Sequence, residues 1–195
     1  MKILFLLLAI LALFACQAQG QSREIDFKGV PFGASEKEFS TKHPSYRCKE
    51  IKEKYFVTGD RHCYTHGLLK RSYQDPKTPG GTFAGVAADI YVNFFDDRLE
   101  TVSVWFFSKD FYIVFAALSS RYGNPVDFKT RTVTNRMGAD FKNTIAIWRR
   151  GDVTLTASRY GSSLDKGQVR YTTEWVREEQ TRRSNATQEK KAGDL

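Results

Sequence analysis

The feature that most limits the fold is a stretch of regular alternation in the middle of the chain. Apolar side chains occupy every second position over residues 86–95, which is typical of a β-strand with one buried face. A second strand is expected over residues 99–107. If residues 96–98 form a three-residue turn, Val92 pairs with Val102 and the apolar positions of both strands share one face.

A second hairpin is expected further along, with strands over residues 144–148 and 153–158. Arg149-Arg150-Gly151 would supply a three-residue turn between them, with glycine at the position that needs a left-handed backbone. This register places Ile147 opposite Val153 on an apolar face and leaves the other face mostly polar.

Two short helices are expected, one before each hairpin. Ser35 and Glu38 form a capping box at the start of the first helix, which Pro44 ends. The second helix covers residues 111–122, after which Gly123 stops it. Its apolar stripe is made of Ile113, Val114, Ala117 and Leu118.

These elements predict an α+β fold of antiparallel β-hairpins with short helices packed on one face, arranged as two helix–hairpin units. The domain is expected to cover residues 22–176, with a strand pair within 46–64 and a last strand over 169–175. Residues 70–85 are rich in Lys, Pro, Gly and Ser and are expected to form an exposed loop. Residues 177–195 are polar and charged, so they are expected to be a disordered tail.

The first residues have the composition of an export signal. Lys2 is followed by an apolar run up to Ala15, which is too short to span a membrane but fits a signal-peptide core. Residues 1–18 are assigned to the signal peptide, with cleavage after residue 15, 18 or 20. Cleavage after residue 15 would leave Cys16 as a lipidated first residue, and later cleavage would remove it. The protein is therefore expected in the periplasm or outside the cell, free or anchored to the outer membrane, without a transmembrane helix.

Every cleavage position leaves Cys48 and Cys63 in the mature chain. Two cysteines in an oxidising compartment most simply form a disulfide. The alternative is a metal site, because His62 and His66 lie beside Cys63. Structural zinc sites need paired ligands at both ends, however, and Cys48 has no such neighbour. We therefore expect a disulfide and no metal.

Charge and motifs narrow the classes of function. The formal net charge is +8, or +7 once Lys2 leaves with the leader, and the basic residues are spread along the chain. An exported protein meets lipid headgroups, cell-wall polymers and acidic proteins, so nucleic acid is not an expected partner. Nucleophile elbows, zinc-protease motifs and nucleotide-binding glycine loops are absent from the sequence. No catalytic residue and no cofactor are expected.

The outer face of the first hairpin is unusually rich in aromatic residues. If Val92 and Val102 face the core, this face carries Tyr91, Phe95, Leu99, Trp105 and Phe107. Either a second layer or the loop at 70–85 covers these side chains, or they bind a partner, with Arg149, Arg150 and Arg159 as a basic rim. The candidate partner-binding residues are Tyr91, Trp105, Phe107, Arg149 and Arg150.

Short motifs in both halves of the chain resemble those of small bacterial exported proteins. They are Gly33-x-Ser35-x-x-Glu38-Phe39, Phe95-Asp96-Asp97-Arg98-Leu99, Leu118-x-x-x-Tyr122-Gly123-x-Pro125, and Trp148 before a turn. Over roughly residues 29–160 the chain resembles the BamE/SmpA-OmlA outer-membrane lipoproteins and the beta-lactamase-inhibitor-protein-like fold. The resemblance implies α+β layers that bind other proteins without a catalytic site. The long linkers and the cysteine pair depart from that scheme.

The sequence therefore predicts an exported, non-enzymatic envelope protein that acts by protein–protein contact, as an assembly accessory or an inhibitor. The alternative is a module that binds an anionic envelope ligand such as a lipid headgroup or a cell-wall polymer.

Overall fold

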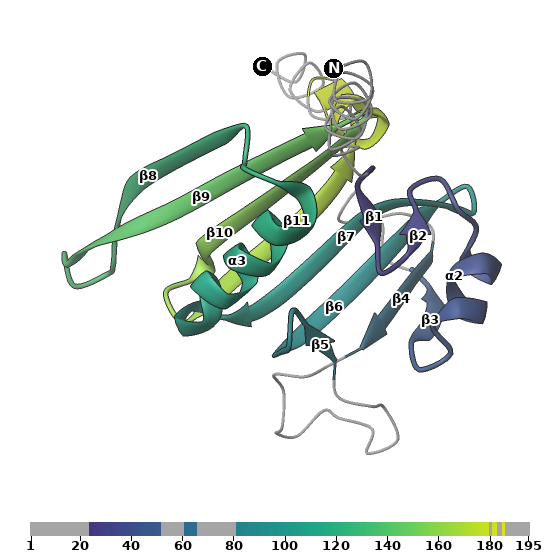
Figure 1. Ribbon diagram of the computed structural model, residues 1–195, viewed down its shortest axis with the longest axis horizontal. Helices are drawn as coiled ribbons and strands as arrows, with labels where there is room; N and C mark the ends of the chain where they lie inside the picture. The colour runs from purple at the N-terminus through teal and green to yellow at the C-terminus, as the bar shows by residue number, and fades with distance from the viewer. Residues whose placement is uncertain (1–23, 52–60, 66–80, 180, 183–184, 186–195) are drawn as a thin grey trace, which may run out of the picture.

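A single large antiparallel sheet dominates the structure, a computed structural model that describes residues 24–51, 61–65, 81–179, 181, 182 and 185 (Figure 1). Among these residues, nine strands form the sheet. In spatial order they are β3 (Arg47–Glu50), β4 (Arg61–Thr65), β6 (Val86–Phe95), β7 (Arg98–Phe107), β11 (Lys166–Thr173), β10 (Val153–Ser163), β9 (Asp140–Arg150) and β8 (Asp127–Thr134), and β5 (Thr82–Phe83) pairs with β6.

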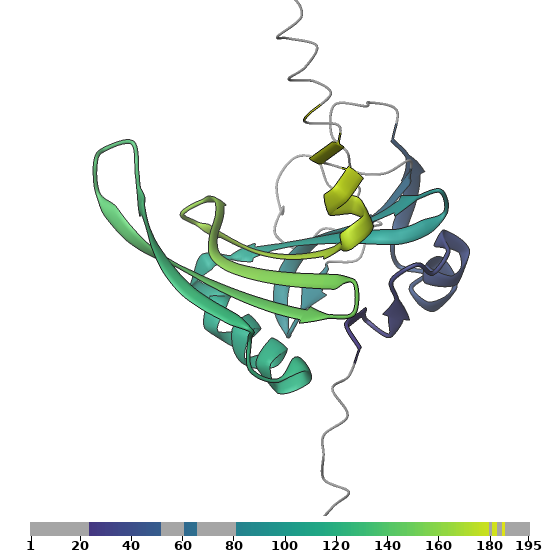
Figure 2. The same cartoon turned by 90° about the horizontal axis from the view of Figure 1, so that it is seen from above.

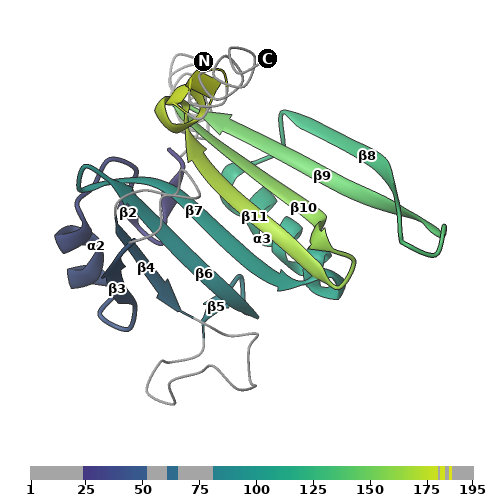
Figure 3. The same cartoon turned by 180° about the vertical axis from the view of Figure 1, so that it is seen from behind.

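The remaining elements are short. A hairpin of β1 (Asp26–Phe27) and β2 (Val30–Pro31) leads into α2 (Glu36–Lys42), and the 3₁₀ turn η1 (Ser108–Asp110) leads into α3 (Phe111–Tyr122). Figures 1 and 3 show that β1–β2 and α3 lie over the same face of the sheet. Residues 174–179 are helical and lie on the opposite face, as Figure 2 shows from above.

The expected fold class, α+β with two helix–hairpin units, is wrong. β7 pairs with β11, for example Val104 with Val169, so the strands of both predicted hairpins belong to one continuous sheet. The fold is sheet-dominated, with α3 and the β1–β2 hairpin as a partial layer on one side. Local patterns indicate hairpins, but they carry no information about which distant strands pair.

The first hairpin has the predicted pairing but a different turn. Val92 pairs with Val102, as expected. The turn itself contains only Asp96 and Asp97, both with positive φ (48° and 58°), and Glu100 is the extra residue of a bulge beside it. The bulge turns Leu99 into the core, where it is fully buried, so the prediction that Leu99 faces outward is wrong.

The second hairpin differs from the prediction in register. Arg150 pairs with Val153, so the turn contains only Gly151 and Asp152. Trp148 therefore faces Leu155, and both are completely buried. The residues predicted for the core face, Ile145 and Ile147, lie on the other face and are only partly buried. An odd shift in register exchanges the two faces of one strand relative to its partner, so the error in turn length inverts β9, whereas Val153 and Leu155 of β10 are buried as predicted.

Both helices begin and end close to the predicted residues. The Ser35 hydroxyl accepts a hydrogen bond from the Glu38 N–H at 3.1 Å, and α2 ends at Lys42. The bounds of α3 are as predicted, with Gly123 at its C-cap. Its apolar stripe is shifted by part of a turn, because Ile113 and Ala117 are exposed. The buried residues of α3 are Phe111, Val114, Leu118 and Tyr122.

The core lies between the sheet and its partial layer. Phe39 of α2 packs on Phe94 of β6, with ring centroids 5.9 Å apart, and Trp148 of β9 lies 5.9 Å from Phe115 of α3. The predicted strand pair within 46–64 is present as β3 and β4, and the Cys48–Cys63 disulfide joins directly paired residues of these strands. The edge of the sheet is thereby tied to the core.

Candidate functional site

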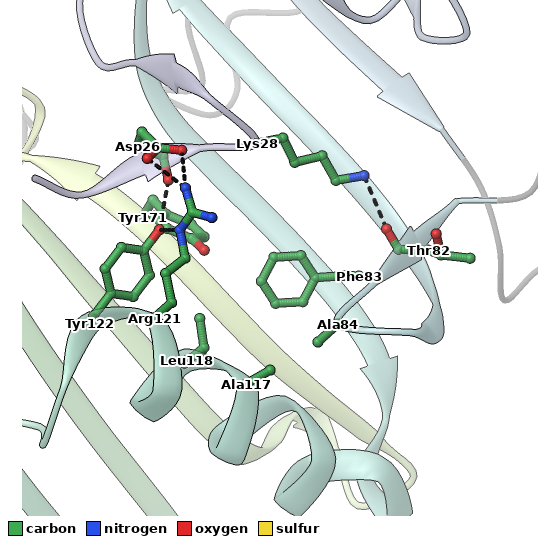
Figure 4. Close-up of a pocket in the computed structure, with 10 residues that line it drawn as sticks. All are labelled: Asp26, Lys28, Thr82, Phe83, Ala84, Ala117, Leu118, Arg121, Tyr122 and Tyr171. Atoms are coloured by element: carbon green, nitrogen blue, oxygen red, sulfur yellow. Dashed lines mark hydrogen bonds and ion pairs between the residues drawn. The ribbon is translucent and has the colours of Figure 1, made fainter. Parts of the chain in front are cut away.

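A cleft of about 340 Å³ opens between α3, the β1–β2 turn and β5 (Figure 4). This volume lies at the lower end of the range of about 300–1,000 Å³ typical of small-molecule sites. The cleft is lined by Asp26, Lys28, Thr82, Phe83, Ala84, Ala117, Leu118, Arg121, Tyr122 and Tyr171.

The floor of the cleft is apolar and buried. Phe83, Leu118 and Tyr171 come from β5, α3 and β11 and are each less than 10% exposed. Phe83 reaches this position because Ala84-Gly85 makes a tight two-residue turn, in which Ala84 has a φ of 51°. Ala117 lines the cleft from the exposed side of α3, as Figure 4 shows. The floor can therefore accept an apolar group.

One wall of the cleft is an ion pair supported by a tyrosine. The Arg121 Nη2 atom donates to both Asp26 carboxylate oxygens, at 2.8 and 2.6 Å, and the Tyr122 hydroxyl donates to the Asp26 carbonyl at 2.9 Å. The hydrogen bond to Asp26 raises the pKa of Arg121. Burial raises the pKa of Tyr122 and of Tyr171, so both phenols stay protonated near neutral pH. These contacts hold Asp26, Arg121 and Tyr122 in place, and the polar groups of the wall bond to one another.

Lys28 stands at the mouth of the cleft. Its Nζ donates to the Thr82 carbonyl oxygen at 3.0 Å, so the side chain reaches from the β1–β2 turn to β5 above Phe83 (Figure 4). The side chain remains accessible to solvent, but the protein atoms around the ammonium group remove enough water to lower its pKa.

The predicted partner-binding residues lie elsewhere, on the face of the sheet opposite α3. Tyr91 stacks on Tyr64 of β4, with centroids 6.4 Å apart. Trp105 is partly buried, and a Cβ atom on Gly161 would meet its ring at 2.7 Å, so Gly161 packs closely on it. Phe107 is 39% exposed. These three side chains share one face of the sheet, on which Tyr91 and Trp105 are partly buried and Phe107 is exposed.

The three predicted rim arginines are not brought to these aromatic residues. Arg159 lies over the ring of Tyr112 on α3, 5.7 Å from its centroid. Strand pairing places Arg149 level with Thr101, six residues along β7 from Phe107 and three strands away. Arg150 points to the other face of the sheet, where its guanidinium donates to the Tyr122 carbonyl at 3.3 Å. A partner contact centred on Tyr91, Trp105 and Phe107 stays a prediction without this rim.

The aromatic face is covered in part by the helical residues 174–179. The ring of Trp175 lies 5.5 Å from that of Phe95, which is only 7% exposed. Residues 70–80 of the loop that was the other expected cover lie outside the described residues.

The disulfide between Cys48 and Cys63 is present as predicted. His62 projects from the opposite side of β4 and packs against Tyr91 at 6.3 Å. His66 lies outside the described residues, as do residues 1–18 with Cys16. Glu36 lies within 4.8 Å of both sulfur atoms, but cysteines in a disulfide offer no thiolate for a metal.

No protein-family model, curated protein or solved structure matches the chain. The resemblance to the BamE/SmpA-OmlA lipoproteins therefore stays a prediction. In the part of the chain that the structure describes, no helix is both long enough and apolar enough to cross a membrane.

The cleft could not be predicted from the sequence because its walls come from segments that are far apart along the chain. Asp26 and Arg121 are 95 residues apart, and Lys28 and Thr82 are 54 apart. The dipeptide Lys28-Gly29 between apolar Phe27 and Val30 is the local signal that could have drawn attention to it, since it marks a tight hairpin with an unusual first turn residue.

Proposed function

We propose that this chain is an exported, non-catalytic binding protein that holds one small, largely apolar ligand in the cleft between α3 and β5. The observation that carries the proposal is the buried apolar floor formed by Phe83, Leu118 and Tyr171 within a cleft of about 340 Å³. A concave apolar site with a few ordered polar groups is the usual form of a small-molecule site. Export is inferred from the leader at residues 1–18.

The polar groups of the cleft favour binding over catalysis. The described residues that line it include no histidine, cysteine or serine that could serve as a base or nucleophile. Its single carboxylate, on Asp26, already accepts two hydrogen bonds from Arg121 and one from the Gly29 N–H. Asp26 therefore acts as a structural acceptor rather than a free base.

The proposal is tested by filling the cleft from its exposed side. N-phenyl-1-naphthylamine is an uncharged probe that fluoresces when it leaves water. The mature protein should bind it saturably, and Ala117→Phe should raise its Kd about tenfold or more because the new ring occupies the cleft. Fluorescence titration measures both values.

Ala116→Phe is the matched control. Ala116 is also an exposed alanine of α3 but does not line the cleft, so this variant should keep the Kd within about twofold. Thermal melts of both variants check that the fold is intact. Equal effects of the two substitutions, or no saturable binding by the wild-type protein, would contradict the proposal.

A further inference from the structure

The β1–β2 turn places a lysine where the backbone does not favour one. Lys28 and Gly29 form its two central residues, with φ angles of 52° and 82°. Tight turns of this kind prefer Asn-Gly, Asp-Gly or Gly-Gly, because most side chains are strained in the left-handed region. Local strain of this type concentrates at ligand clamps, where the surrounding structure maintains it.

The surroundings hold this turn through three separate hydrogen bonds. The Asp26 carboxylate accepts from the Gly29 N–H at 2.7 Å, and the Lys42 Nζ donates to the Gly29 carbonyl at 3.2 Å. The His43 Nε2 lies 3.1 Å from the Lys28 carbonyl. Because β1 and α2 both contribute, the position of Lys28 is defined before any ligand arrives.

The charge of Lys28 has no counterion among the described residues. Among these residues, its ammonium group donates a hydrogen bond to the neutral Thr82 carbonyl, which takes one of three ammonium protons. The aromatic rings of Phe27 and Tyr46 lie 5.9 and 5.5 Å from Nζ. Arg121, the other cation of the cleft, is already paired with Asp26. Lys28 is therefore the cation that remains to receive an anion.

We propose that the ligand of the cleft carries a single anionic group, which Lys28 binds at the mouth while the apolar body of the ligand rests on Phe83 and Leu118. This inference rests on the proposed function and narrows its ligand to a compact molecule with one carboxylate, sulfonate or phosphate group. A strained, preordered and unpaired lysine beside an apolar floor fits that chemistry.

Two probes with the same ring system distinguish the contribution of the anionic group to binding from that of apolar contact. The anionic probe is 8-anilinonaphthalene-1-sulfonate, and the uncharged one is N-phenyl-1-naphthylamine. Lys28→Gln should raise the Kd of the sulfonate about tenfold, because it removes a charge-assisted hydrogen bond, and should leave the Kd of the uncharged probe within about twofold. Lys28→Arg should restore most of the sulfonate affinity.

Lys109→Gln is the matched control, since it removes the same charge from an exposed lysine that does not line the cleft. It should leave both Kd values within about twofold. The proposal of an anionic ligand is overturned if Lys28→Gln and Lys109→Gln raise the Kd of the sulfonate equally, or if Lys28→Gln raises the Kd of both probes equally. In either case, saturable binding of the uncharged probe still supports the cleft as a binding site. If the wild-type protein binds neither probe, the proposed function itself fails.

Discussion

Two tight turns of this protein each place a residue other than glycine in the left-handed backbone region. The residue type suits that conformation at Asp97 but not at Lys28. Asp97 has a φ of 58°, which aspartate tolerates, and its carboxylate accepts a hydrogen bond from the Glu36 N–H at 2.9 Å at the start of α2. Lys28 adopts a similar φ, but its side chain makes no hydrogen bond within its own turn. The fold explains the identity of Asp97, whereas we attribute the identity of Lys28 to the ligand binding proposed above.

Lys28→Asn tests whether Lys28 serves binding rather than stability. Asparagine accepts the left-handed backbone, so we expect the free energy of unfolding to rise by about 0.5 kcal/mol. Urea denaturation of the wild-type and variant proteins measures the change. A loss of more than about 1 kcal/mol would mean that the Thr82 hydrogen bond and the Phe27 and Tyr46 contacts make Lys28 a stabilising residue instead.

At the level of strands and helices, prediction succeeds where one face is unambiguous. Positions 86–95 alternate cleanly, so the pairing of Val92 with Val102 follows even though the turn length was mistaken. In β9 both faces are apolar, with Ile145 and Ile147 on one and Ala146 and Trp148 on the other. The choice depends on tertiary contacts, because the Trp148 indole donates to the Gly123 carbonyl at 2.8 Å.

The disulfide offers a test of how β3 is held. Cys48 and Cys63 are directly paired across β3 and β4 at the edge of the sheet, 15 residues apart in sequence. Closing a loop of that length restricts the unfolded chain, so replacing both cysteines by serine should lower the free energy of unfolding by about 3 kcal/mol.

The measurement is denaturation of the wild-type protein with and without dithiothreitol, beside the double variant. The reduced wild-type protein and the double variant should have similar midpoints, and the reductant should not change the variant. An unchanged midpoint on reduction would show that strand pairing alone holds β3.

For the molecule as a whole, the β7–β11 pairing has the largest consequences. It joins the strands of both hairpins into one sheet and sets α3 beside the β1–β2 hairpin on the same face (Figure 1). The cleft lies between these two elements and β5. A formal net charge of +8 also favours the approach of anions to that cleft.

Two histidines make stability depend on pH. Burial is the main cause that lowers the pKa of His43 and of His62, and nearby lysines add to it: Lys28 and Lys42 for His43, Lys49 for His62. The unfolded chain therefore takes up protons first as the pH falls below about 6.5, and the free energy of unfolding falls with it until the lowered pKa values are passed.

Urea denaturation at about pH 8, 6.5 and 5 measures this dependence. His43→Gln combined with His62→Gln should flatten the part of the profile just below about pH 6.5, because neither replacement titrates. An equally steep profile in the double variant would assign the effect to other groups.

Local information in the chain is enough for the bounds of α3, the Ser35 cap of α2, the pairing of the first hairpin and the Cys48–Cys63 disulfide. Each depends on residues close in sequence or, for the disulfide, on there being one pair left to form. The strand order and the cleft depend on contacts between segments 50 to 100 residues apart. Such pairing follows from burial across the whole core, which no short pattern encodes.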